Sequence, residues 1–420
     1  MVYFDLISFL MALYFHSFKK VMLKFVILFA CCSSTILISC QEKGSVKNLS
    51  SVEKEQPNSD YKPAFKGQTR VAGYKTQTEY QVDIINTSLG RPWGMAQLPS
   101  GDFLITEKTG FINLVSKDGK TITKITGLPK VDSRGQGGLL DIAIDPDFLT
   151  NKTVYWTFSE PYEKGNLTAV GKGVLSENKI DNVKIIFRAT PSYNGRLHYG
   201  SRLVFDKSEN LFVSTGERSD LETRPLAQDL KAYLGKILKI DKNGKPAAGN
   251  PFIGNDNAQP EIFSYGHRNP QGLAINPPTG DLWETEMGPR GGDEINLIQA
   301  GKNYGWPTIT YGIEYSGKAI NNGLTKQAGL EQPVYYWDPV ISPSGITFYT
   351  GNITEWKNNL FIACLSGEKI DRIIIENNKV VGEERLLEDQ HERFRDVFDG
   401  KDGNLYAITD SGKLYRISKK

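Results

Sequence analysis

The most constraining feature of this sequence is a hairpin unit that recurs along the chain. Each copy has a short apolar run, a turn of Gly, Asp, Asn or Pro residues, and a second run rich in β-branched and aromatic residues. Six copies occur, over residues 93–106, 139–157, 201–215, 271–285, 344–363 and 394–409. Alternating apolar positions and short turns are typical of antiparallel strands, and not of strands that alternate with helices.

The distance between hairpins indicates how they are arranged. Successive copies lie roughly 45 to 80 residues apart, which leaves room for two more strands in each unit and for long loops. No stretch of helical periodicity of any length competes with this pattern. The repetition predicts an all-β fold, a six-bladed β-propeller of four-stranded antiparallel blades. A sandwich of meanders is the alternative arrangement of the same hairpins.

The N-terminal residues have the pattern of a targeting segment. An apolar run over residues 21–39 follows Lys19 and Lys20 and ends at Cys40. We interpret residues 1–39 as a lipoprotein signal peptide and Cys40 as the lipidated residue of a protein of the bacterial cell envelope, periplasmic or at the outer membrane. A single membrane-spanning helix is the alternative. Translation starts at Met1 or at Met22, and the sequence leaves that choice open.

The residues after Cys40 divide into a polar segment and a folded domain. Residues 40–66 have no apolar period and predict a flexible tether, so the propeller domain covers residues 67–420. Without residues 1–40 the chain has 47 basic and 47 acidic residues, a balance that gives no support for nucleic-acid binding. Cys364 is the one cysteine left in this domain, which must therefore be stabilised by its core and not by disulfides.

Residues 263–307 carry more polar chemistry than any other stretch. Histidine, arginine, amide and carboxylate side chains are interspersed there with many Gly and Pro residues. This composition is poor for a helix or a plain strand and suits rigid loops that present polar groups. We predict that the segment forms a wall of an active site.

Further candidate site residues lie immediately before or after one of the hairpins. In a propeller such loops converge at one end of the central channel, so residues far apart in sequence share one site. The candidates are Gln136, His198, Glu217, Arg268, Asn269, residues 286–294, Arg393 and Arg395. Taken singly, the same residues have ordinary interpretations: a hydrogen-bonded loop histidine, a turn carboxylate that pairs with Arg218, and solvent-exposed arginines.

Three of these segments carry a family resemblance. Residues 135–148, 266–274 and 286–307 resemble the soluble, calcium-dependent pyrroloquinoline quinone (PQQ) sugar dehydrogenases, the glucose/sorbosone and aldose sugar dehydrogenase family, over roughly residues 80–418. The resemblance implies a six-bladed propeller that binds PQQ and Ca²⁺ and oxidises aldose sugars at C1 to lactones. The chain has no C-x-x-C-H haem motif, so electrons would pass to a separate acceptor.

The resemblance also implies roles for the matched residues. His198 would be the general base that removes the hydroxyl proton, and Glu217 would orient it. Arg268 and Asn269 would lie at the reacting quinone carbonyl, where Arg268 would stabilise negative charge.

The remaining matched residues would hold the cofactor and the metal. Gln136 would contact the quinone, and Arg393 and Arg395 would bind its carboxylates. The carbonyl groups of Gly288 and Pro289 would be the calcium ligands. Asp293 and Glu294 match a motif whose expected role is to fix this loop, so we do not expect them to be ligands of the catalytic ion.

Two positions depart from the family pattern. Ser366 stands where many relatives carry a lysine that contacts the quinone, and Lys369 is the nearby residue that could replace it. Met287 stands where glucose dehydrogenases have a polar residue. Two alternatives to the dehydrogenase therefore stay open: a non-catalytic propeller binding module that has lost quinone binding, and a calcium-dependent hydrolase such as a lactonase.

Overall fold

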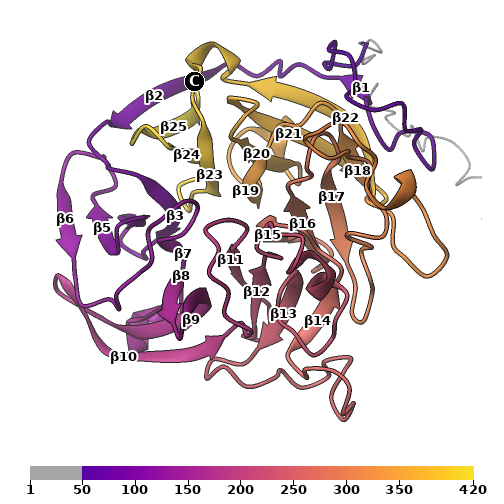
Figure 1. Ribbon diagram of the computed structural model, residues 1–420. Coiled ribbons are helices and arrows are strands. Elements are labelled where there is room, and N and C mark those ends of the chain that lie inside the picture. The colour runs from indigo at the N-terminus through magenta and orange to yellow at the C-terminus, as the bar shows by residue number, and fades with distance from the viewer. Residues whose placement is uncertain (1–49) are drawn as a thin grey trace, which may run out of the picture. The chain divides into compact units, whose positions relative to one another are not determined.

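A computed structural model describes residues 50–420 (Figure 1). The predicted signal peptide, the predicted lipidation site at Cys40 and the first part of the predicted tether lie outside the described residues. Within residues 50–420, no helix has the length and apolar character needed to cross a membrane.

Residues 50–420 form six β-sheets, most of them four-stranded and antiparallel, so the predicted propeller is confirmed. The first blade has β3 (Pro92–Gln97), β4 (Phe103–Glu107), β5 (Phe111–Val115) and β6 (Ile122–Ile125). The second has β7 (Leu139–Ile144), β8 (Thr153–Tyr162), β9 (Gly165–Ser176) and β10 (Lys179–Arg188). The third has β11 (Gly200–Phe205), β12 (Leu211–Thr215), β13 (Lys236–Ile240) and β14 (Ile262–Tyr265).

The other three blades follow the same order along the chain. The fourth has β15 (Pro270–Ile275), β16 (Leu282–Glu286), β17 (Asp293–Ile298) and β18 (Tyr335–Trp337). The fifth has β19 (Pro343–Phe348), β20 (Leu360–Cys364), β21 (Lys369–Glu376) and β22 (Lys379–Leu386), with β1 (Ala72–Gly73) parallel to β22. The sixth has β23 (Phe394–Asp399), β24 (Leu405–Thr409), β25 (Leu414–Lys419) and β2 (Tyr80–Asn86).

Helices are few and short in the described residues. They are α2 (Phe148–Asn151) and the 3-10 turns η1 (Arg224–Ala227), η2 (Asn321–Gly323), η3 (Thr354–Trp356) and η4 (Glu388–Gln390). The six predicted hairpins coincide with the first two strands of each blade along the chain; α2 lies in the β7–β8 connection and η3 in the β19–β20 connection.

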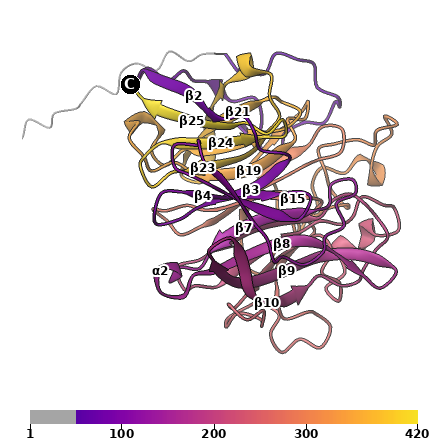
Figure 2. The same cartoon turned by 90° about the vertical axis from the view of Figure 1, so that its left-hand side faces the viewer.

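The ring closes between the two ends of the propeller domain. β2 pairs antiparallel with β25, in a register that places Tyr80 opposite Lys419. Figure 2 shows β2 beside β25, next to the C-terminus. The sixth blade therefore takes one strand from the N-terminal side and three from the C-terminal side, so it can form only when both ends meet.

The core lies between neighbouring blades. Trp156 and Leu139 of the second blade pack in one cluster with Leu104 and Ala96 of the first. Because each blade is covered on both faces, central strands such as β4 and β12 are buried at every residue and read as apolar runs.

The described part of the predicted tether, residues 50–66, contacts the propeller. Glu53 forms a 2.6 Å ion pair with Arg385. The backbone N–H groups of Asn58 and Ser59 donate to the Asp338 carboxylate, at 2.8 and 3.1 Å. The structure differs here from the flexible tether that the composition predicts, because polar contacts, which leave no apolar period in the sequence, hold this segment.

A buried ion triad lies at the centre of the ring. The Arg202 guanidinium on β11 is 3.0 Å from Asp141 on β7 and 3.1 Å from Asp396 on β23. Burial raises the pKa of Asp396 to about 7. The charge of Arg202 offsets this only in part, and Arg202 also donates a hydrogen bond to Asp141. Carbon atoms added at Gly94 or Gly345 would come within 2.3 and 1.7 Å of these carboxylates, so both glycines provide the space for them.

We expect Arg202→Met to lower the free energy of unfolding by about 3–5 kcal/mol, because it leaves two buried carboxylates without their cation. Urea denaturation measures the change. Arg188→Met is the control, since Arg188 pairs with Glu160 at the surface, where its side chain is 39% exposed, and its loss should cost less than about 1 kcal/mol. Equal losses for the two variants would contradict the role of the triad.

Candidate active site

A cavity of about 480 Å³ opens at one end of the channel. Its lining includes seven residues that the sequence predicts for the site, namely Gln136, His198, Arg268, Gly288, Pro289, Arg393 and Arg395. Six of them lie in loops of the second, third, fourth and sixth blades, and Arg395 lies at the start of β23, so the fold brings together residues spread over more than half of the chain. Glu217 and Asn269 do not line the cavity and lie behind its wall.

His198 is held from two sides in the loop before β11. Its Nδ1 atom lies 2.6 Å from Oε1 of Glu217, and its backbone N–H donates to the Gln136 side-chain oxygen at 2.7 Å. Since an ionised carboxylate only accepts, the proton between His198 and Glu217 is assigned to Nδ1, which leaves Nε2 as a free base.

The electrostatic surroundings keep this imidazole neutral. Burial, followed by the positive charge of Arg268, lowers the pKa of His198 to about 4, and the opposing effect of Glu217 is smaller. His198 is 6% exposed, so it is shielded from solvent and still lines the cavity. Such a group accepts a proton at neutral pH without first having to lose one.

Glu217 is buried and faces His198 and its own turn. Its Oε1 atom also accepts from the backbone N–H of Ser219 at 3.1 Å. This second bond fixes the carboxylate, and the fixed carboxylate in turn sets the orientation and tautomer of the ring.

Arg268 points across the loop that carries Gly288. Its Nη1 atom donates to the carbonyl oxygens of Met287 and Gly288 at 2.8 and 2.7 Å, and its guanidinium lies over Trp306 at 5.3 Å. Its Nε atom is buried without a partner among the described residues. The guanidinium therefore keeps donor capacity beside the cavity.

Asn269 is fully buried and acts on the wall. Its Oδ1 atom accepts from the backbone of Gly200 at 3.2 Å, and its amide nitrogen lies 3.6 Å from the Met287 sulfur. The side chain of Met287, the residue that departs from the family pattern, therefore contacts Asn269. The structure thus joins Asn269 to the neighbouring loops and not to the cavity.

Asp293 fixes the loop that holds Gly288 and Pro289. One carboxylate oxygen accepts from the Gly288 N–H at 2.7 Å, and the other accepts from the N–H groups of Ile341 and Ser342, each at 2.7 Å. Burial raises the pKa of Asp293 to about 7 although these three bonds lower it in part. This contact agrees with the sequence interpretation of Asp293 as a loop-fixing residue.

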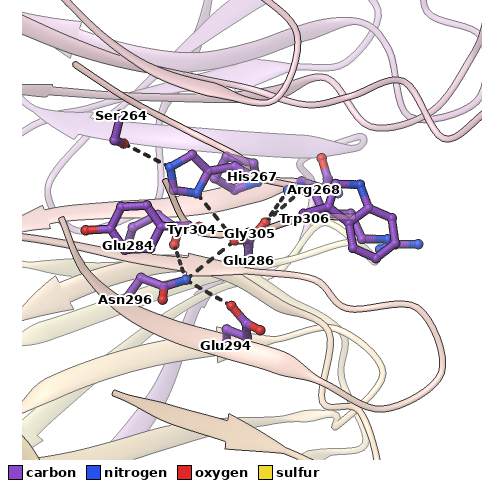
Figure 3. Close-up of polar contacts among 12 residues, drawn as sticks. Ser264, His267, Arg268, Glu284, Glu286, Glu294, Asn296, Tyr304, Gly305 and Trp306 are labelled. Carbon is purple, nitrogen blue, oxygen red and sulfur yellow. Dashed lines mark hydrogen bonds and ion pairs between the residues drawn. The ribbon is translucent and has the colours of Figure 1, made fainter. Parts of the chain in front are cut away.

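Glu294, which is half-buried, belongs to a polar cluster behind the same loop, and the other members of the cluster are buried (Figure 3). Asn296 donates to Glu284 at 3.0 Å and to Glu294 at 3.2 Å. His267 contacts Glu286 at 3.4 Å. Burial, followed by the charge of Glu286, raises the pKa of Glu284 and Glu294 well above the ordinary value.

This cluster was missed by the sequence analysis, although its pattern is readable. Glu284 and Glu286 lie two residues apart on β16, and the register places them opposite Asn296 and Glu294 on β17. The ligand atoms of His267, Glu284 and Glu286 lie within 4.8 Å of one another, close enough to share a cation. Glu286 also accepts the backbone N–H groups of Arg268 and Asn269, so the cluster supports the site.

Arg393 and Arg395 share one carboxylate. Their Nε atoms donate to Asp410 at 3.1 and 2.9 Å. Burial alone would raise the pKa of Asp410, but the two arginines, Arg395 above all, lower it below its usual range. The pair therefore carries one net positive charge into the cavity.

Arg91 and Lys108 also line the cavity and were not predicted. They flank the hairpin over residues 93–106, so the rule that singled out the other candidates applies to them as well. Tyr315, from the long loop between β17 and β18, is 72% exposed and lines the cavity too. A loop residue of this kind carries no periodic signal in the sequence.

The lysine suggested as a substitute at Ser366 does not reach the cavity. Ser366 lines the cavity, and its hydroxyl pairs with that of Ser342 at 2.7 Å. Lys369 is buried 3.6 Å from Asp371 and is absent from the lining. Lys369 is the first residue of β21, and its ion pair with Asp371 on the same strand keeps it within the fifth blade.

The fold and the cavity define a six-bladed propeller whose central pocket surrounds a buried neutral histidine with cationic side chains. Residues 89–416 match the Glucose / Sorbosone dehydrogenase family, and the chain belongs to this family.

Similar proteins cover most of the chain. Aldose sugar dehydrogenase YliI of Escherichia coli is 40% identical over 347 residues, which are 81% of this chain and 93% of the relative. Quinoprotein glucose dehydrogenase B of Acinetobacter calcoaceticus is 26% identical over 78% of this chain and 85% of the relative. The PQQ-bound form of an aldose sugar dehydrogenase from Streptomyces coelicolor has a TM-score of 0.69 and 29% identity, and covers 82% of this chain and 100% of its own.

We expect His198 to be neutral at pH 7, with its proton on Nδ1 and a pKa near 4. Because burial and Arg268 lower this pKa, the ring should gain a second proton only as the pH falls through about 4. A ¹⁵N NMR titration of the imidazole measures both the pKa and the tautomer, and His198→Ala assigns the signal. A pKa above 6.5, or a proton on Nε2, would contradict the geometry.

Proposed function

We propose that this protein oxidises aldose sugars at C1 to lactones in a PQQ- and calcium-dependent reaction, with His198 as the general base. The observation that carries the proposal is a neutral, buried His198 beside Arg268 in a cavity lined by five cationic side chains and one carboxylate. The family membership and the dehydrogenase relatives support the same reaction class.

The cavity suits a polyanionic, planar cofactor. Arg91, Lys108, Arg268, Arg393 and Arg395 line it, against the single carboxylate of Asp410. PQQ carries three carboxylates, and arginine binds carboxylates in bidentate fashion. The guanidinium of Arg268 belongs to this lining and adds to its positive charge.

Different residues of the cavity would transfer the proton and bind the cofactor. His198 takes the hydroxyl proton of the sugar at Nε2, and Glu217 holds the ring and stabilises the imidazolium that forms. Arg393, Arg395 and Gln136 would hold the cofactor, and Arg268 would donate to its carbonyl group. When bound, PQQ would supply the two-electron acceptor for C1 of the sugar, with calcium as a Lewis acid.

Calcium would bind the carbonyl oxygens of Gly288 and Pro289. Both residues line the cavity, and calcium prefers oxygen ligands that include backbone carbonyls. A carbon atom added at Gly288 would lie 2.3 Å from the Gly292 carbonyl, so this tight loop accepts only glycine there. Asp293 keeps the loop in place from behind.

We further propose that electrons leave to a separate acceptor and that a lipid on Cys40 anchors the protein in the cell envelope. The first proposal rests on the lack of a haem-attachment motif, and the second on the sequence before Cys40.

A dye-linked assay tests the proposed reaction. The purified protein is given glucose and a panel of aldoses, with and without PQQ and calcium. We expect turnover only when both are present, and a loss of about 10²- to 10⁴-fold in kcat for His198→Ala because the base is removed.

The alternatives have different outcomes in this assay. Lactone or ester hydrolysis without PQQ would indicate a calcium-dependent hydrolase. No turnover, together with an unchanged PQQ absorbance on mixing, would indicate a binding module that has lost the quinone.

A further inference from the structure

Arg91 and Lys108 face each other at the end of the β3–β4 ladder. The N–H group of Lys108 donates to the Arg91 carbonyl at 3.0 Å, one residue beyond the pair of Pro92 and Glu107. Both residues line the cavity; Lys108 is half-buried and Arg91 is exposed. Like charges at opposite positions of a sheet are destabilising, so the fold carries a cost at this point.

Nearby carboxylates relieve this cost only in part. The carboxylate of Glu107 accepts from the backbone N–H groups of Gly90 and Arg91, at 2.9 and 2.7 Å, and from the Asn113 amide at 2.8 Å. Asp410 is taken by Arg393 and Arg395. The ammonium group of Lys108 donates instead to a neutral acceptor, the Gly135 carbonyl, at 2.5 Å.

The positive charges of other cavity residues also repel the Lys108 ammonium group. Burial, followed by the charges of Arg91 and Arg395, lowers its pKa from the ordinary lysine value, and the charge of Asp410 opposes this in part. An anion placed between these three groups would therefore be attracted by all of them, and the mutual repulsion would become a favourable interaction.

Another part of the lining carries no charge. Ser366 lines the cavity and forms a neutral bond with Ser342. Lys369 is held by Asp371 in the fifth blade. Among residues 50–420, Lys108 is the one lysine that lines this cavity.

We propose that Lys108, assisted by Arg91, binds a carboxylate of PQQ. This inference rests on the proposed function. Arg393 and Arg395 together with Asp410 carry one net positive charge, which balances one carboxylate of PQQ. The other two carboxylates of PQQ need further cations. Lys108 and Arg91 are two cations without a carboxylate partner within 4.0 Å in the described chain, and they supply that positive charge.

Titration of the protein with PQQ in the presence of calcium, followed by tryptophan fluorescence, tests this role without any turnover. Trp93 lines the cavity and serves as a reporter. We expect Lys108→Gln to raise the Kd about tenfold or more, because it removes a charged hydrogen bond, and to weaken the dependence of the Kd on salt. Lys108→Arg keeps the charge and should stay within about threefold of the wild-type Kd.

Lys117→Gln is the matched control, since Lys117 is an exposed lysine in the turn after β5 of the same blade. Its Kd should equal that of the wild type. Tight binding by the wild type with an unchanged Kd in Lys108→Gln would overturn the role of Lys108 and leave the proposed function standing. Absence of PQQ binding in the wild type would overturn both.

Discussion

The centre of this propeller depends on one buried cation. Arg202 on β11 reaches Asp141 on β7 and Asp396 on β23, and its Nε atom donates to the Gln271 carbonyl on β15 at 3.0 Å. Asp396 also accepts the N–H group of Met95 on β3 at 3.1 Å. One guanidinium and its two carboxylates thus join the inner strands of five blades. Because unpaired charges are so costly in a protein interior, this network favours the arrangement of the ring that keeps the three charges together.

The same triad supports the active-site cavity. The Trp93 ring lies over the Arg202 guanidinium at 4.4 Å, and Trp93 and Gln271 both line the cavity. The cavity therefore rests on a rigid base. His198, four residues before Arg202, lies in the loop that leads into β11, and Arg395, one residue before Asp396, lies in β23 itself. Because the inner strands are fixed, they position these functional groups more precisely than a flexible loop could.

The hairpins could be predicted because each is local: its apolar alternation and its turn lie within about twenty residues. Residues at the ends of hairpins could be grouped for the same reason, and Arg91 and Lys108 satisfied that rule as well as His198 did. What the sequence could not predict is which face of a loop a side chain takes. Asn269 turns into the wall and Lys369 into its blade, while Arg268, next to Asn269, remains at the cavity. The triad joins residues 61 positions apart and more, beyond the reach of any local pattern.

The central claim is that His198 removes a sugar proton beside a quinone bound in this cavity. Anaerobic mixing of glucose with the PQQ- and calcium-loaded protein, with no other acceptor, measures this in one turnover through the absorbance of the bound quinone. The account predicts rapid reduction in the wild type, and in His198→Ala retained PQQ binding with reduction slowed by about 10²-fold or more. An unchanged spectrum after sugar is added to a protein that binds PQQ, or equal reduction rates in the two proteins, would contradict it.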